Sequence, residues 1–179
     1  MGDAKLREGF AVLDKLGLSF DAYIYHPQLH EVADLANAFP GATIILNHVG
    51  GPLGVGPYAG KRDAIFPDWK ESMTALAASP NVVVKVGGLV MPVCGFDWHE
   101  RTMPMASGEL ARETAPYYLH CIEQFGPVRC MFESNFPVDK VACSYTVLWN
   151  AFKRLAHCFT PGEQAALFHD TAARVYRLS

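Results

Sequence analysis

Hydrophobic and polar positions along this chain switch between a helical period and short apolar runs. The helical spacing predicts helices over residues 3–16, 28–39, 68–78, 109–125, 144–157 and 160–177. The apolar runs, rich in β-branched residues, predict strands at Leu18–Tyr25, Thr43–Asn47, Asn81–Val86 and Val128–Phe132. A helix therefore follows each of the four predicted strands.

The ends of the predicted helices carry recognisable signals. Asp3 can cap the first helix, whose apolar side consists of Leu6, Phe10, Leu13 and Leu16. Thr160–Glu163 reads TPGE, a capping box with proline at the first helical position, and predicts the start of the last helix. These signals fix where the first and last helices begin.

Four successive β-then-α units predict parallel strands with right-handed connections. Long segments follow the second, third and fourth strands, whereas the returning connections are short. A complete eight-stranded TIM barrel needs roughly 200 residues or more, and this chain has 179. We therefore expect an α/β fold: a single domain over residues 1–179 that forms a partial (β/α)8 TIM barrel, with about four parallel βα units and a carboxyl-terminal helix.

Half a barrel leaves two exposed sheet edges, which are prone to pair with other chains. A truncated barrel, an open four-stranded sheet and two copies that complete each other are all compatible with the pattern. We expect either a missing amino-terminal half or a homodimer.

Composition and charge limit the kinds of partner and the cellular compartment that we expect for this chain. Half of the residues are hydrophobic, and the net charge of −3 gives no electrostatic basis for binding nucleic acid or an anionic membrane. The five cysteines are odd in number and never spaced CxxC, which favours a reducing compartment over a disulfide scaffold or a zinc knot. No apolar run approaches the roughly 20 residues of a membrane span, and the first residues lack an apolar signal core. We expect a cytoplasmic protein that acts on a small molecule.

Three predicted strands end in residues that can perform chemistry. His26 follows YIY, His48 follows TIILN, and Glu133–Asn135 follows the fourth strand, with Asp139 four residues further on. The carboxyl ends of parallel strands meet on one face, where such folds place their active sites. A neutral imidazole can bind a divalent metal such as zinc or polarise a carbonyl group. A carboxylate can hold a metal or take a proton from water. Together these residue types suit hydrolysis.

Each of these residues also has a purely structural interpretation. His48 could be hydrogen-bonded within a packed loop, and His26 could cap the helix that follows it. Glu133 could be the partner of Arg129 or Lys85 in a buried ion pair. Asn135, before Phe136-Pro137, could be a turn residue only.

The segment Gly50–Gly60 is rich in glycine and proline but lacks the GxGxxG and GK[ST] patterns of nucleotide sites. We expect it to shape a lid or pocket wall, with Tyr58 and Arg62 as substrate contacts, because a guanidinium suits a substrate carboxylate. His99 and Arg101, in a later long segment, could also cover the substrate. The helical histidines are expected to be surface or packing residues: His120, His157 and His169.

Three blocks of the sequence carry a family resemblance. HPQLHEVADLANAFPGATIILNHVGGP, WKESMTALAASPNVVVKVGGL and RCMFESNFPVDK resemble the carboxyl-terminal half of the amidohydrolase-2 family. Its members are TIM barrels of the metal-dependent-hydrolase type and include sugar-acid lactonases and 2-pyrone-4,6-dicarboxylate lactonase. The resemblance runs from about Phe10 to the end of the chain.

The resemblance implies roles for particular residues. His48 matches the family's histidine at an inner strand end, which is a metal ligand or polarises the carbonyl. Asn135 stands where many members carry a catalytic aspartate in SDWP, and here the sequence reads SNFP. An amide cannot accept a proton as a carboxylate does, so this task would pass to Asp139, to Glu133 or to another mechanism. The family's HxH pair has no counterpart in this sequence, and members differ in whether they need a metal.

We therefore predict a hydrolase that opens a lactone of a small acidic metabolite by attack of water on the carbonyl. The predicted catalytic residues are His48, Asn135 and Asp139, and the predicted substrate-binding residues are His26, Tyr58, Arg62 and Glu133. His48 is the expected metal ligand. Two alternatives remain: a non-catalytic fragment that needs a partner half, and a decarboxylase of the same superfamily.

Overall fold

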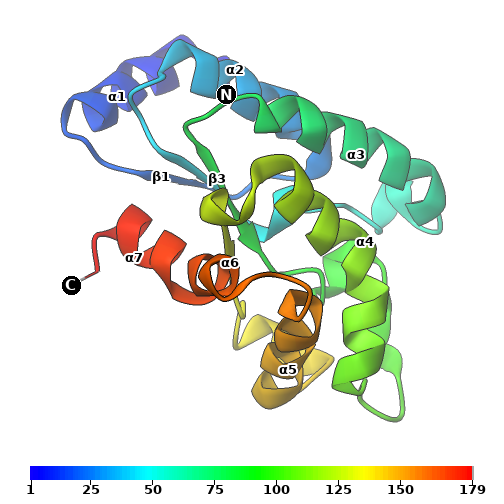
Figure 1. Ribbon diagram of the computed structural model, residues 1–179. Helices are drawn as coiled ribbons and strands as arrows, with labels where there is room; N and C mark the ends of the chain where they lie inside the picture. The colour runs from blue at the N-terminus through cyan, green and yellow to red at the C-terminus, as the bar shows by residue number, and fades with distance from the viewer. Residues whose placement is uncertain (179) are drawn as a thin grey trace.

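The computed structural model describes residues 1–178, which form one layer of parallel strands with helices packed around it (Figure 1). The strands are β1 (Phe20–Ala22), β2 (Ile44–Leu46), β3 (Val82–Val86) and β4 (Cys130–Phe132). The helices are α1 (Ala4–Lys15), α2 (Leu29–Ala38), α3 (Arg62–Ala77), α4 (Ser107–Phe125), α5 (Tyr145–Ala156), α6 (Pro161–Ala165) and α7 (Thr171–Tyr176). Short helical turns include η1 (His26–Gln28), η2 (His48–Gly50) and η7 (Val138–Val141), and α6 and α7 are joined by the π-helical segment η8 (Ala166–Asp170).

The sheet confirms the predicted fold class. Its order is β1-β2-β3-β4, every neighbouring pair is parallel, and Ile44 of β2 lies opposite Phe20 on one side and Val82 on the other. Consecutive strands in sequence are thus neighbours in space, as in a (β/α)8 barrel. The described residues form about half of such a barrel.

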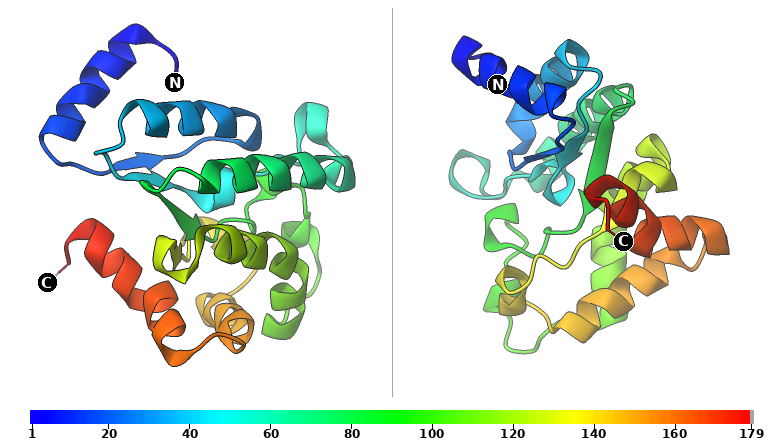
Figure 2. Two further views of the ribbon diagram at one scale, coloured as in Figure 1. Left: turned by 45° about the horizontal axis from the view of Figure 1, so that its top comes forward. Right: turned by 90° about the vertical axis from the view of Figure 1, so that its left-hand side faces the viewer.

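The two faces of the sheet are covered by different helices. Residues such as Ile44, Val84 and Phe132 point to the side of α2, α3, α4 and α5 and belong to the main hydrophobic core. On the opposite face, Ile45, Val83 and Met131 pack with Val175 of α7. Figure 1 shows α7 lying close to β1, and the two ends of the chain lie apart in the views of Figure 2. Because α7 lies on the face that would line the inside of a barrel, Ile45, Val83 and Met131 are buried there, whereas Asp21 of β1 stays exposed.

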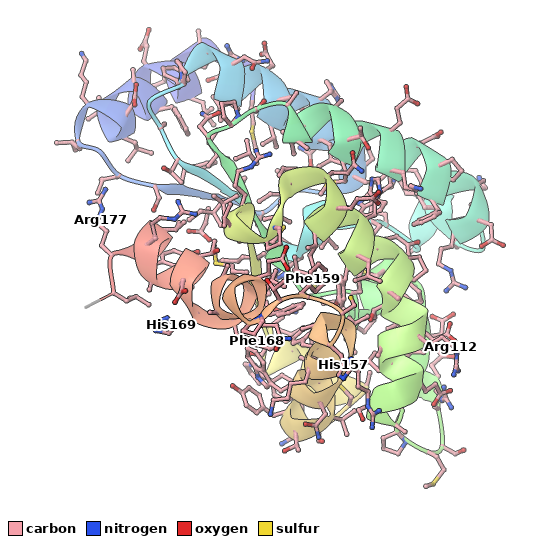
Figure 3. All side chains as sticks on the ribbon, in the orientation of Figure 1. Arg112, His157, Phe159, Phe168, His169 and Arg177 are labelled. Carbon is pink, nitrogen blue, oxygen red and sulfur yellow. The ribbon has the colours of Figure 1, made fainter. Side chains whose placement is uncertain are left out.

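Polar residues of α7 and the strands are linked on this inner face. Lys85 donates a hydrogen bond to Asp21 Oδ1 at 2.6 Å, and the hydroxyl of Tyr176 donates to the same oxygen at 2.8 Å. Arg177, after α7, donates to the carbonyl of Gly17, just before β1; Figure 3 labels Arg177 at this position. These contacts attach the last helix to the first strand.

Side chains also hold the turns at the amino ends of the strands. The amide of Asn81 donates to the carbonyl oxygens of Ala36, Phe39 and Ala42, at 2.9–3.1 Å. Arg129 donates in the same way to the carbonyls of Ala77, Ser79 and Phe125, at 2.9–3.0 Å. Carbonyl oxygens at helix ends need such partners, so this end of the sheet serves stability.

The third helix differs from the sequence prediction. The predicted loop 49–67 is too long, because α3 begins at Arg62 and contains Pro67 within it. An interior proline costs roughly 3 kcal/mol, but burying an aliphatic side chain such as Ile65 contributes about 1.5–3 kcal/mol. The fully buried Trp69 adds a large aromatic surface, and together these two residues offset the proline.

The first and last helices also differ in detail. Asp3 caps α1 as predicted, through its side chain and the N–H of Leu6. However, Phe10 alone of the four predicted apolar residues is fully buried, and Leu16 is 65% exposed. The capping box of Thr160 and Glu163 is present as predicted, but the last helix passes through η8. No helix among residues 1–178 combines the length and hydrophobicity needed to cross a lipid bilayer.

Candidate active site

His48 lies in a sharp turn at the carboxyl end of β2. His48 and Val49 both have left-handed backbone conformations, with φ of 54° and 47°. This region is unfavourable for a β-branched residue such as valine. The burial of Val49, whose carbonyl accepts a hydrogen bond from the indole of Trp69 at 2.9 Å, stabilises the turn. The turn thereby directs the imidazole of His48 across the strand ends.

Glu133, which follows β4, binds His48 through two hydrogen bonds. Its Oε1 lies 3.0 Å from the backbone nitrogen of His48 and 2.5 Å from Nδ1 of the ring. Because Oε1 accepts the backbone N–H, we assign it as acceptor toward the ring as well, so Nδ1 carries the hydrogen. Nε2 of the neutral ring is then an acceptor, and no group among residues 1–178 binds it. A carboxylate that orients a histidine in this way also stabilises its protonated form.

Two glycines after β3 make room for this pair. A Cβ atom on Gly88 would lie 2.6 Å from ring atoms of His48, and one on Gly87 would lie 2.5 Å from Cγ of Glu133. Gly88 also has a φ of +77°, which residues with side chains rarely adopt. The glycine pair that follows Val86 therefore makes room for the site by its lack of side chains.

Asn135 and Asp139 form a second pair beside the first. The amide of Asn135 donates to Oδ1 of Asp139 at 2.9 Å, and the N–H of Asp139 donates to the carbonyl of Asn135 at 3.2 Å. Asn135 has a φ of +47°, a conformation that asparagine tolerates better than most residues. The two hydrogen bonds close the turn that leads into η7.

Asp139 is enclosed in the protein. Its side chain has no exposed surface, and Oδ2 lacks a hydrogen-bond partner. Burial raises the pKa of this carboxyl to about 7, against the opposing effects of the Asn135 hydrogen bond and of nearby His48. Near neutral pH, Asp139 is therefore divided between its charged and neutral forms.

Tyr23, just after β1, packs against His48. The two rings meet edge to face with centroids 5.2 Å apart, and the hydroxyl of Tyr23 lies 3.4 Å from that of Tyr25. The hydrogen bond with Tyr25, followed by burial, raises the pKa of Tyr23 to about 12. All four strand ends thus contribute to one site: Tyr23, His48, Gly87-Gly88 and Glu133.

His26 and Tyr58 lie together at the glycine-rich loop. Nδ1 of His26 accepts the N–H of Leu53 at 3.1 Å, and its ring meets that of Tyr58 with centroids 5.0 Å apart. Burial lowers the pKa of His26, with an opposing effect from Asp68. A neutral His26 therefore holds the loop, and its contact with substrate stays a prediction.

Arg62 occupies a different environment from His48. Its guanidinium lies over the ring of Phe96 at 4.5 Å, where it lines a 340 Å³ cavity with residues of α3 and α4 such as Tyr117. The sequence placed Arg62 in a loop, whereas it begins α3. Within residues 1–178 no hydrogen bond or ion pair connects Arg62 to the His48 site.

The structure also decides between the structural interpretations of other residues. The suggested partners of Glu133 are wrong, because Arg129 binds backbone carbonyls and Lys85 binds Asp21. Arg101 pairs with Glu109 at 2.8 Å. His120 is buried between α3 and α4, whereas His157 and His169 are exposed (Figure 3). The prediction of packing or surface roles for these three histidines is confirmed.

Comparison with models of known protein families shows which family this chain matches. The family model Amidohydro_2, described as amidohydrolase, matches residues 2–178. The chain belongs to this amidohydrolase family. Predicted membership and the TIM-barrel relationship are both confirmed.

Relatives in this family are similar over almost the whole chain. An uncharacterized protein, y4mH, of Sinorhizobium fredii is 40% identical over 96% of this chain and 51% of its own length. An L-fucono-1,5-lactonase of Burkholderia multivorans is 30% identical over 98% of this chain and 57% of its own length. A crystal structure of an amidohydrolase from B. multivorans with bound zinc covers 99% of this chain and 58% of that one, with 29% identity and a TM-score of 0.84. The chain therefore spans about half the length of these relatives.

The zinc of that amidohydrolase raises the question of whether the residues described here can bind a metal. Zinc takes at least three protein ligands in the sites that proteins build for it. Within residues 1–178, no group of three histidine, cysteine or acidic side chains is arranged to hold an ion. His48 offers Nε2, but Glu133 is bound to His48 and Asp139 is enclosed. These residues do not fit a metal by themselves.

Sequence reasoning missed three components of the amidohydrolase site. Tyr23 was absent from the predicted residues, although it begins the segment YIY that leads to His26. The two glycines after β3 were also missed, although they resemble the glycines that follow His48. Position in the sequence gave the signal in each case, since each residue directly follows a strand.

Proposed function

We propose that this amidohydrolase hydrolyses a lactone of a small acidic metabolite at the His48 site. The observation that carries the proposal is the pairing of His48 with Glu133 at the strand ends, which leaves Nε2 open. Relatives named L-fucono-1,5-lactonase and L-rhamnono-gamma-lactonase support a sugar-acid lactone as the substrate class.

His48 carries the proton in this proposal. Nε2 takes a proton from water as the water oxygen bonds to the lactone carbonyl carbon. The bond between that carbon and the ring oxygen then breaks, and Nε2 returns the proton to the departing ring oxygen. Glu133 stabilises the charged ring between the two steps, as a carboxylate does for a catalytic histidine. For the neutral ring, this geometry favours proton acceptance over the carbonyl polarisation expected from the sequence.

Asn135 and Asp139 divide the role expected of a catalytic aspartate. Asn135 is half-buried and is proposed to position the attacking water. Asp139 has no exposed surface, so it acts through Asn135, whose amide it holds. In the proposal Asp139 is thus a positioning residue.

The test is an assay of the purified chain with sugar-acid lactones, including L-fucono-1,5-lactone and L-rhamnono-gamma-lactone. Acid release is followed with a pH indicator, and released CO₂ is measured to detect decarboxylation. We expect His48→Ala to lower kcat/KM by more than about tenfold. The matched control is His157→Ala, an exposed histidine on α5, which should keep wild-type activity.

Two results would contradict the proposal. One is wild-type chain that releases no acid from any lactone. The other is a His48→Ala variant with wild-type turnover. Release of CO₂ without ring opening would favour the decarboxylase alternative.

The coverage of the relatives supports a second candidate. The chain spans 51–58% of y4mH, the fuconolactonase and the zinc-bound amidohydrolase, and it supplies a single open imidazole nitrogen to the site. The chain would then be inactive alone and become active with a second polypeptide. The test is to mix it with the part of the B. multivorans L-fucono-1,5-lactonase that it does not match and to assay lactone opening.

A further inference from the structure

With His48 assigned to proton transfer, the carbonyl oxygen of the lactone still lacks a hydrogen-bond donor. Negative charge develops on the carbonyl oxygen when water attacks a lactone, and enzymes place hydrogen-bond donors there. Neutral His48 cannot supply this donor, because its single N–H is bound to Glu133. Another donor near the ring of His48 is therefore required.

Tyr23 brings a hydroxyl-bearing side chain into contact with that ring. Its edge-to-face contact with His48 places it at the same strand ends, with ring centroids 5.2 Å apart. The side chain remains 53% exposed, so a ligand over His48 can reach its hydroxyl. In the free protein the hydroxyl of Tyr25 lies 3.4 Å from that of Tyr23. A lactone carbonyl over His48 would replace Tyr25 as the acceptor of the Tyr23 O–H.

We propose that Tyr23 is a catalytic residue that donates its phenol O–H to the carbonyl oxygen of the lactone. This inference rests on the proposed function. As the water oxygen bonds to the carbonyl carbon, the π electron pair moves onto the carbonyl oxygen, which Tyr23 holds without transferring its proton. The pair returns when the ring C–O bond breaks.

The protonation of Tyr23 agrees with this role. Its pKa of about 12, raised chiefly by the Tyr25 hydrogen bond, keeps the phenol neutral at physiological pH. A neutral phenol donates a hydrogen bond, whereas a phenolate could only accept one.

The experiment compares Tyr23→Phe with a matched control. Phenylalanine keeps the ring that packs on His48 and removes the hydroxyl. We expect kcat to fall at least about tenfold while KM changes little, because donors to a developing oxyanion act mainly in the transition state. The control is Tyr145→Phe, since Tyr145 on α5 is equally exposed at 53% and lies in no part of the site; its kcat should not change.

Two further measurements separate the proposed contact from a packing effect. A cyclic ether with the substrate's ring but no carbonyl should inhibit wild type and Tyr23→Phe equally, because it lacks the carbonyl oxygen that the phenol is proposed to bind. The urea midpoint of Tyr23→Phe should match that of wild type. A lower midpoint would be followed by Tyr23→Trp, which keeps a ring with an N–H donor and should retain more activity than Tyr23→Phe.

The outcomes distinguish this inference from the function on which it rests. An active wild type with an equally active Tyr23→Phe would overturn the role of Tyr23 alone. A weaker inhibition of Tyr23→Phe by the cyclic ether would also overturn it, because the residue would then serve binding. A wild type that opens no lactone, alone or mixed with the complementary half, would overturn both.

Discussion

Asp139 is a carboxyl group buried where its charged form is unfavourable. An aspartate normally reaches water with both oxygens, but here one oxygen is held by Asn135 and the other is buried without a partner. Burial of this kind disfavours the charged form and raises the pKa, here to about 7. The buried carboxyl therefore makes the stability of the fold depend on pH.

The sign of that dependence follows from proton binding. The carboxyl of Asp139 has an ordinary pKa of 3.8, which applies to the unfolded chain, and a pKa of about 7 in the folded chain. Between these two pH values the folded state therefore binds more protons than the unfolded state. The contribution of Asp139 to stability is complete below pH 4 and is lost as the pH rises toward 7. Asp139→Asn removes this loss, so its stability relative to wild type should rise by roughly 2–3 kcal/mol between pH 5 and pH 8.

Urea unfolding of wild type and Asp139→Asn at these two pH values measures the difference. Other titrating groups are common to both proteins and cancel in the comparison. A stability difference that is the same at pH 5 and pH 8 would show that Asp139 ionises as freely in the folded chain as in the unfolded one.

At the scale of elements, the two ends of β3 serve different roles: one supports the candidate site and the other stabilises the fold. Its carboxyl end leads to the two glycines beneath His48 and Glu133, whereas Asn81, just before its amino end, binds three backbone carbonyls. One strand therefore joins the residues of the candidate site to those that hold the end of α2.

Replacing Asn81 should destabilise the fold and leave the geometry of the site unchanged. Asn81→Ala removes the side-chain donor from three carbonyl oxygens, of which that of Phe39 keeps the backbone N–H of Ala42. We expect a loss of about 1–3 kcal/mol in the free energy of unfolding. Asn150→Ala, at an exposed position of α5, is the matched control and should change it little. Chemical denaturation measures both, and equal stability of the two variants would contradict the role of Asn81.

On the scale of the whole molecule, the sheet ends in two open edges. Within residues 1–178, β1 pairs only with β2 and β4 only with β3. Apolar residues are exposed beside both edges: Leu16 and Leu18 precede β1, and Val128 precedes β4. Unpaired edges next to apolar surface favour association with another chain.

We therefore expect the purified chain to form a dimer in solution. Light scattering combined with size-exclusion chromatography over a wide range of concentrations measures its mass. Leu16→Lys should shift the equilibrium toward monomer, whereas Val55→Lys, an exposed valine in the glycine-rich loop, should not. A chain that is monomeric at every concentration would contradict the prediction.

The sequence by itself determined the order and type of the elements and the strand ends at which chemistry-bearing residues occur. These features depend on local signals, namely hydrophobic periodicity, caps and turn residues, which are written within a few positions of one another. The start of α3 was predicted too late, because the burial of Ile65 and Trp69 outweighs the helix-breaking effect of Pro67.

Only the tertiary structure decided which residues meet. His48 and Glu133 are 85 positions apart in the chain, and no local signal distinguishes this pairing from one with Arg129 or Lys85. The burial of Asp139, the contact of Tyr23 with His48 and the stacking of Arg62 on Phe96 depend likewise on how separate units pack. Side-chain surroundings are set by neighbours remote in sequence, so pairing, pKa and exposure emerge only in the folded chain.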